Sequence, residues 1–204
     1  MKPDLLEKWK GWAELLFPLL IFAVLYLVRR CRNYRQAQRL REIAPLLNGE
    51  AVLRPFSAPA IRGIYMGHSY RMSCFPSARN SPGRLQIFLG FPCGVRFEVV
   101  PKEGRPGVEE LLFRKKRVAV ADDSFNATVV VREEKEWEKA SLYLDNPRNR
   151  ELLVELVDRG FRSIRFESDG VTLIKEGDFL GRDGLGAEKA MEYLTLAGRL
   201  LERF

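Results

Sequence analysis

A long apolar run near the N-terminus constrains the fold of this chain more than any other feature. Residues 12–28, WAELLFPLLIFAVLYLV, contain one charged residue, Glu14. A helix needs about 17 to 25 predominantly apolar residues to cross a bilayer, and membrane helices tolerate a proline such as Pro18. The run therefore predicts an uncleaved transmembrane helix. The positions that represent this membrane anchor are Trp12, Leu19, Val24 and Val28.

Two other interpretations of the run stay open. The first is a secretory signal peptide, but its cleavage site needs small residues, whereas Val28 is followed by RRCR. The second is a hairpin buried inside a soluble core. The transmembrane interpretation is preferred because Trp9 and Trp12 lie at one end of the run and Tyr26 and Tyr34 at or beyond the other, as in the two aromatic belts of a bilayer.

The segment after the run is strongly basic. It reads RRCRNYRQAQRLR from Arg29 to Arg41 and has no acidic residue. Only three lysines precede the span, and the flank richer in Lys and Arg stays in the cytoplasm. We therefore expect a single-pass protein of the cell (inner) membrane, with its N-terminus outside and its C-terminal domain cytoplasmic. The residues that set this topology and would contact lipid headgroups are Arg29, Arg30, Arg32, Arg35, Arg39 and Arg41.

Apolar residues at helical spacing run through the basic segment. Ala37, Leu40, Ala44 and Leu47 recur every three or four residues, which predicts that the span continues as an amphipathic helical stalk. The expected organisation is a short non-cytoplasmic tail (1–11), a transmembrane helix (12–28), a basic stalk (29–47) and a folded cytoplasmic domain (48–204).

The charge of the chain is unevenly distributed. The net charge is +7, and the six arginines of the stalk account for all but one of these charges. The remaining domain is nearly neutral, so a basic surface for nucleic acid is not expected. The expected partners are the lipid bilayer and one or more proteins in the membrane, with no nucleic acid.

Strand patterns dominate the first half of the domain. AIRGIYMGHSYRMSCF predicts a β-hairpin that turns around Met66, Gly67 and His68. RLQIFLGF and GVRFEVVP predict two further strands, and RVAVADDSFNATVVVRE predicts one or two more. An antiparallel sheet is the expected outcome.

Helical patterns appear in the second half. EEKEWEKASLYL and NPRNRELLVELVDRG predict helices, the latter starting near Pro147 and ending at Gly160. FRSIRFESDGVTLIKEG predicts a hairpin turning at Asp169 and Gly170, and AEKAMEYLTLAGRLLERF predicts a terminal helix. The class is α+β: a mainly antiparallel sheet with two or three helices packed on it.

Part of this pattern supports a resemblance. An acidic residue followed by a Phe, a Val-rich strand, an Arg-led Leu-rich helix and a hairpin occur within about residues 122–174. In this order the segment resembles an uncharacterised bacterial family of membrane-anchored proteins. The resemblance implies the fold and the anchoring, and it implies no catalytic residue. It rests on Phe125, Val129, Leu142, Leu144, Arg150, Leu153, Leu156, Phe166 and Gly170.

Candidate chemistry is sparse. The single histidine, His68, lies six residues before Cys74, and Cys93 completes a possible nucleophilic region. The loop Gly181–Gly186 precedes a helix and lacks the Lys-Ser/Thr of a phosphate-binding loop. We expect no metal ion and no cofactor. A second basic run could dock an acidic partner, or could be a solvated strand edge: Arg114, Lys115, Lys116 and Arg117.

The sequence therefore predicts a binding protein rather than an enzyme. The expected role is a scaffold or accessory subunit of a membrane complex, acting through its cytoplasmic domain. The alternative is an enzyme or ligand-binding domain that uses the Gly181–Gly186 loop or the region of His68, Cys74 and Cys93.

Overall fold

The computed structural model describes residues 3–54, 57–77, 81–102, 116–135, 137–177, 179 and 185–203. The helices are α1 (Pro3–Ile43), the 3-10 helix η1 (Ala44–Leu47), α3 (Asp123–Thr128), α4 (Trp137–Asp145), α5 (Pro147–Asp158), α6 (Ala187–Gly198) and the 3-10 helix η2 (Leu201–Arg203). The strands are β1 (Gly49–Val52), β2 (Ala60–Tyr65), β3 (His68–Phe75), β4 (Arg84–Gly90), β5 (Arg96–Pro101), β6 (Lys116–Val118), β7 (Val129–Lys135), β8 (Phe161–Glu167) and β9 (Gly170–Glu176).

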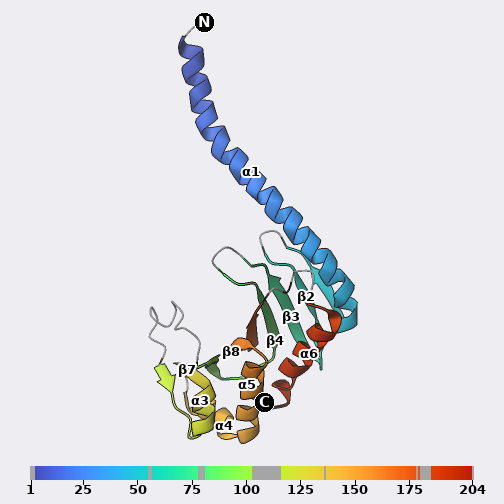
Figure 1. Ribbon diagram of the computed structural model, residues 1–204, viewed down its shortest axis with the longest axis vertical. Coiled ribbons are helices and arrows are strands. Elements are labelled where there is room, and N and C mark those ends of the chain that lie inside the picture. Colours follow the sequence, from blue (N-terminus) through green and yellow to red (C-terminus); the bar gives the residue numbers. More distant parts are fainter. Residues whose placement is uncertain are drawn as a thin grey trace.

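One sheet organises the domain. In the described part of the chain it has nine strands in the order β1-β2-β3-β4-β9-β8-β5-β7-β6. Every neighbouring pair is antiparallel. Strands β9 and β8 enter the middle of the sheet although they come late in the chain, so the two halves of the sequence share one sheet (Figure 1). The predicted α+β class with a mainly antiparallel sheet is confirmed.

The helices of the domain pack on one face of this sheet. α4, α5 and α6 contact β5, β8 and β4, and Phe125 of α3 is buried in the same core. The alternation of the strands directs apolar side chains such as Met72, Ile87 and Phe166 to that face, where they are fully buried. The opposite face of the sheet, called the open face below, carries the alternate residues of each strand.

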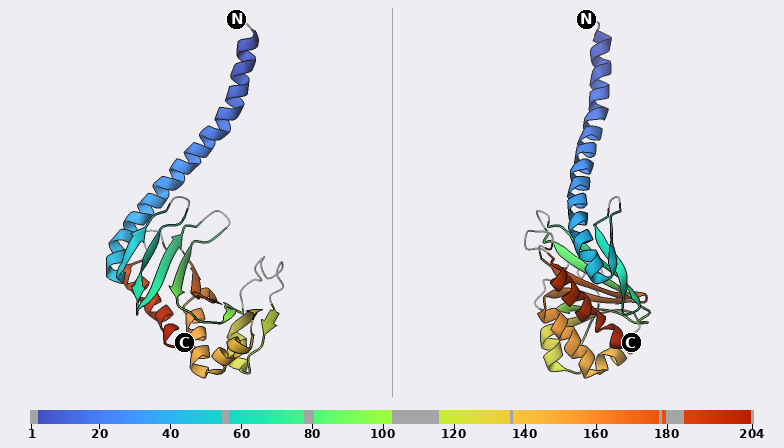
Figure 2. Two further views of the ribbon diagram at one scale, coloured as in Figure 1. Left: turned by 180° about the vertical axis from the view of Figure 1, so that it is seen from behind. Right: turned by 90° about the vertical axis from the view of Figure 1, so that its right-hand side faces the viewer.

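The long helix α1 joins the domain only at its C-terminal end. Ala37 and Leu40 are buried there together with Leu47 of η1. The Tyr70 hydroxyl of β3 donates a hydrogen bond of 2.8 Å to the Leu47 carbonyl oxygen. The rest of α1 projects away from the domain in every view (Figures 1 and 2). The C-terminal end of the stalk is therefore part of the domain core.

The transmembrane prediction for residues 12–28 is not supported by the structure. Within the part of the chain that is described, no helix combines the length and the apolar character needed to cross a bilayer. The described side chains of α1 begin at Leu16, so the side chains of residues 12–15 lie outside the described residues.

The two predicted hairpins turn differently. Met66 and Gly67 have positive φ angles of 50° and 80° and connect β2 to β3, which confirms the first turn at these two residues, whereas His68 is the first residue of β3. The second turn is not at Asp169 and Gly170, because Glu167 pairs with Gly170 and the turn residues are Ser168 and Asp169. Gly170 is the first residue of β9, where a side chain would collide with the Leu89 carbonyl oxygen.

Two element boundaries also differ from the prediction. A short helix, α3, separates β6 from β7, because the Asp122 carboxylate accepts the Phe125 backbone N–H at 3.0 Å and caps it. The segment EEK was expected to begin a helix, but it continues β7 to Lys135, and α4 begins at Trp137. The predicted start and end of α5 are confirmed: the Asn146 side chain accepts a hydrogen bond of 3.1 Å from the Arg148 backbone N–H, Pro147 is the first helical residue, and Gly160 follows the helix with φ of 88°.

Candidate anion-binding face

The residues of the predicted nucleophilic region do not come together as one site. His68 begins β3 and packs edge-on against Phe91, with ring centroids 6.1 Å apart. Cys74 is buried near the other end of the same strand, about 20 Å away at 3.3 Å per residue. The Cys93 thiol donates to the backbone carbonyl of Glu167. Burial raises the pKa of the Cys74 thiol to about 12, which keeps it protonated and unreactive at neutral pH.

The other predicted site segments lie largely outside the described residues. This holds for residues 181–184 of the glycine loop, and for Arg114 and Lys115 of the second basic run. Lys116 and Arg117 belong to β6, at the edge of the sheet, where they pair with Glu133 and Arg132 of β7. The side chains of Lys116 and Arg117 are not described.

The described part of the predicted anchor is a strongly exposed apolar surface. Its large apolar side chains are between 45% and 69% exposed, although the chain is folded. Folded soluble proteins rarely expose contiguous apolar patches larger than a few hundred Å². These side chains are Leu16, Phe17, Leu19, Leu20, Ile21, Phe22, Val24, Leu25, Leu27 and Val28.

A row of directly paired residues crosses the open face from one edge of the sheet to the other. We call it the arginine row, because five of its nine positions are arginine. Its members are Glu50 (β1), Arg62 (β2), Arg71 (β3), Phe88 (β4), Thr172 (β9), Arg165 (β8), Glu98 (β5), Arg132 (β7) and Arg117 (β6).

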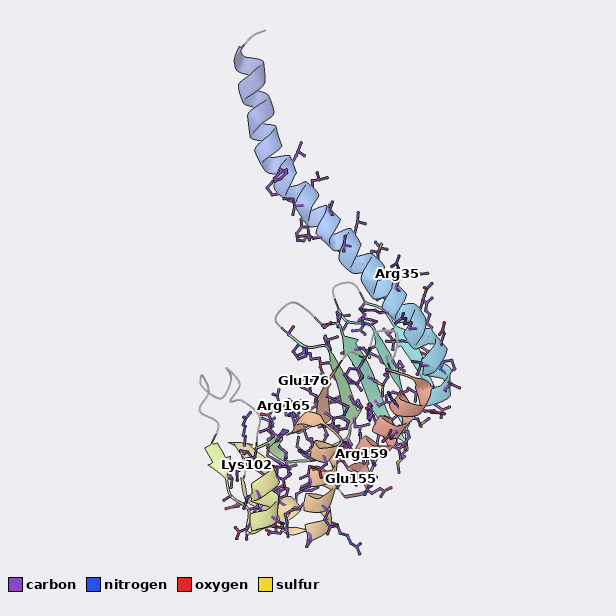
Figure 3. All side chains as sticks on the ribbon, viewed as in Figure 1. Arg35, Lys102, Glu155, Arg159, Arg165 and Glu176 are labelled. Atoms are coloured by element: carbon purple, nitrogen blue, oxygen red, sulfur yellow. The ribbon has the colours of Figure 1, made fainter. Side chains whose placement is uncertain are left out.

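One half of the arginine row is internally compensated. The Glu98 carboxylate is only 5% exposed and lies 3.3 Å from Arg165 and 3.8 Å from Arg132. The Ser163 hydroxyl donates a further hydrogen bond of 2.7 Å to it. In Figure 3, Arg165 of β8 is labelled apart from Glu155 of α5 and from Arg159, the residue that follows α5. The Glu98 carboxylate offsets one of the two positive charges and contacts both guanidinium groups, so it holds β8 and β7 to β5 between them.

In the other half of the row, Glu50 lies opposite Arg62 but is exposed and forms no ion pair with either arginine in the described part of the chain. Arg62 and Arg71 face each other directly on β2 and β3, and neither forms an ion pair with any residue that the structure describes. The Arg71 Nε atom is buried without a hydrogen-bond partner. The pKa of the Arg62 guanidinium is lowered. The largest cause is the positive charge of Arg54, followed by desolvation and by the positive charge of Arg71. Like charges directly opposite each other destabilise a sheet, so this pair requires an explanation other than stability.

A depression surrounds the two arginines. It has a volume of about 590 Å³ and lies over β2, β3, β4 and β9. The pair lines it together with hydroxyl and amide groups and with two half-buried aromatic rings. Ser73 and Thr172 are buried within it. Its further lining residues include Gln86, Phe75, Phe88 and Glu167.

Two glycines make a flat seat for one of these rings. Gly90 and Gly170 pair with each other on β4 and β9. A Cβ on Gly170 would lie 2.9 Å from the Phe88 ring, and one on Gly90 would lie 3.3 Å from it. The ring therefore occupies the space left by the two missing side chains and lies low over the sheet. Phe88 is at the same time directly opposite Arg71.

The fold and this face define an α+β domain on a helical stem, with an unpaired arginine pair in a polar, partly aromatic depression. No family model, no curated protein and no solved structure matches the chain. The resemblance to a family of membrane-anchored proteins therefore stays a prediction.

The predicted turn at Met66 and Gly67 is enough to predict the arginine pair from the sequence. With Met66 and Gly67 as a two-residue turn, Tyr65 pairs with His68, and the same register places Arg62 opposite Arg71. The contributions of β4 and β9 could not be found in this way, since β4 pairs with a strand more than 80 residues later in the chain.

Proposed function

We propose that this chain is a single-pass membrane-anchored accessory protein whose cytoplasmic domain acts by binding an anionic partner. The observation that carries the binding role is the uncompensated pair Arg62 and Arg71 in the depression of the open face. The anchoring role is supported by the exposed apolar surface of α1 from Leu16 to Val28.

Lipid is the environment that suits this part of α1. The apolar side chains point in all directions around the helix, so a single protein partner would cover only one side of it. The arginines that follow the apolar surface would then meet the headgroups of the anionic cytoplasmic leaflet, each contributing roughly 1 kcal/mol of attraction. We therefore expect the domain on the cytoplasmic side.

Cys31 provides a test of anchoring and orientation. It is exposed on α1, just beyond the apolar surface. A membrane-impermeant maleimide should label it in inverted membrane vesicles and not in right-side-out vesicles, and the chain should stay in the membrane fraction after alkaline carbonate washing. Labelling of right-side-out vesicles would refute the orientation. Release by carbonate would refute the anchor.

An anion would remove the repulsion within the arginine pair. A ligand with a phosphate or carboxylate group accepts charge-assisted hydrogen bonds from both guanidinium groups, and it supplies the partner that the buried Arg71 Nε lacks. Since charge-assisted hydrogen bonds contribute about 1.5 to 3 kcal/mol each, loss of the pair should weaken binding at least tenfold.

The binding test uses the full chain in nanodiscs of zwitterionic phosphatidylcholine. Pyrophosphate affinity is measured by calorimetry for the wild type and for the double variant Arg62→Ala, Arg71→Ala. The matched control, Arg159→Ala with Arg199→Ala, removes the same charge from exposed ion pairs on the helical side. We expect the first double variant to lose binding and the control to keep it. Equal affinities in the three proteins would refute the site.

A further inference from the structure

We propose that the anion recognised by the arginine pair is the phosphate of a nucleotide, free or within a single strand of nucleic acid, and that Phe88 stacks on its base. This inference rests on the proposed function, because it assigns a ligand class to the same depression. It is carried by the aromatic half of the site, which anion binding alone does not need.

The position of Phe88 suits base stacking. Its ring is half-buried, with the glycine pair Gly90 and Gly170 below it, while the ring itself lines the depression. A planar base can therefore lie on the ring without displacing a neighbouring side chain. Aromatic side chains on an open sheet face are a common platform for bases in single-strand recognition.

The arginines lie at a suitable separation from that platform. Neighbouring strands are about 4.8 Å apart, so Arg71 on β3 stands one strand from Phe88 and Arg62 on β2 stands two strands away. A nucleotide carries its phosphate one sugar unit from its base. With its base on Phe88, its phosphate would reach the arginine pair along the row.

The remaining lining groups agree with this ligand. Ser73 and Gln86 pair with each other beside Arg71 and Phe88, and Thr172 lies beyond Phe88 on β9, so hydroxyl and amide groups flank the platform where a sugar or a base edge requires hydrogen bonds. The volume of about 590 Å³ falls within the 300 to 1,000 Å³ typical of small-ligand sites. An acidic peptide would use the arginines but would leave the seated ring without a role.

The experiment compares ligands that share the phosphate and differ in the base. The full chain in phosphatidylcholine nanodiscs is titrated with pyrophosphate, with 2-aminopurine nucleoside triphosphate, with single-stranded oligonucleotides that contain 2-aminopurine, and with poly-glutamate. The fluorescence of 2-aminopurine is quenched when the base stacks, so it reports contact with Phe88 directly. The variants are Phe88→Leu, Phe88→Trp and the Arg62, Arg71 double variant.

We expect the base-containing ligands to bind more tightly than pyrophosphate and to be quenched. Phe88→Leu should weaken their binding roughly tenfold and leave pyrophosphate unchanged, whereas Phe88→Trp should restore stacking. Affinity that rises with oligonucleotide length would identify a strand as the source, and equal affinity for the mononucleotide would identify the free nucleotide. Thermal melting of each variant checks that the fold is intact.

The outcomes separate this inference from the proposed function. Binding of pyrophosphate that depends on the arginine pair, with no gain from a base and no effect of Phe88→Leu, would overturn the nucleotide inference and keep the anion site. Preferential binding of poly-glutamate would do the same in favour of an acidic protein. No arginine-dependent binding of any of the probes would overturn both.

Discussion

Replacing Glu98 by Gln is expected to destabilise the domain strongly, although the two side chains have nearly the same shape. The carboxylate is buried between Arg132 and Arg165, and Ser163 donates a third contact to it. The amide cannot neutralise either guanidinium. The substitution therefore leaves two arginines, on the two strands that flank β5, without their shared counter-charge.

The magnitude follows from burial. Removing one partner of a fully buried ion pair costs about 3 to 5 kcal/mol. Here the arginine side chains keep 12% and 29% of their exposure, so water screens part of the unpaired charge. We expect a loss of about 2 to 3 kcal/mol. For a chain of this size each kcal/mol lowers the Tm by roughly 2 to 4 °C, which predicts a fall of about 4 to 12 °C.

Near-ultraviolet circular dichroism during heating of the detergent-solubilised chain measures this change. The matched control is Glu155→Gln, which removes a carboxylate from an ion pair with Arg199 whose side chains are 35% and 43% exposed. An exposed pair contributes at most about 1 kcal/mol, so the control should melt close to the wild type. Equal Tm values for both variants would show that the buried triad does not hold the sheet together.

Three smaller predictions follow from individual positions. Met66 occupies a left-handed turn position with φ of 50°, a conformation that asparagine tolerates better than methionine. Met66→Asn should therefore raise the free energy of unfolding in urea by about 0.5 to 1 kcal/mol. An unchanged urea midpoint would contradict this assignment of the turn. A hydrogen bond from the Ser124 hydroxyl, then a backbone amide and an arginine, lower the pKa of Asp122 to about 2. Because the folded pKa lies below the ordinary value, the Tm gap between wild type and Asp122→Asn should be constant above about pH 4 and close as the pH falls toward 2; a gap that persists at pH 2 would contradict this. Cys31 is exposed and Cys74 is buried, so iodoacetamide at pH 8 should label Cys31 in the folded chain and Cys74 only after unfolding. Mass spectrometry of the labelled peptides measures both reactions. Equal labelling rates in the native protein would contradict the burial of Cys74.

Local signals predicted the elements with their own start or stop residues. Asn146 and Pro147 fix the start of α5, and Gly160 fixes its end, because capping and φ preferences act within a few residues. The extension of β7 through the EEK segment was not predictable in this way. Its strand conformation comes from pairing with β5, so tertiary contact overrides a helical composition.

The candidate site shows why a charge count along the chain was insufficient. The domain is nearly neutral in sequence, since its acidic and basic residues balance. Strand alternation and the order of strand pairing decide which of these residues are neighbours. Arg62 and Arg71 pair with each other, while Glu98 lies between two other arginines. Net charge is a property of composition, whereas a binding surface depends on register.

Substitutions in the two halves of the arginine row are expected to change the Tm in opposite directions. Glu98 is a buried carboxylate between two arginines, whereas the carboxylates near Arg62 and Arg71 are the exposed Glu50 and the half-buried Glu167, and neither forms an ion pair with them among the described residues. If the pair is kept for a ligand, its repulsion lowers the stability of the free protein, and Arg62→Gln should raise the Tm while abolishing pyrophosphate binding. Added salt should narrow the Tm difference by screening the repulsion. Saturating pyrophosphate should raise the Tm of the wild type and leave that of the variant unchanged. A lower Tm for Arg62→Gln without ligand would show that Arg62 is a structural residue, and the argument from the unpaired charges would fail.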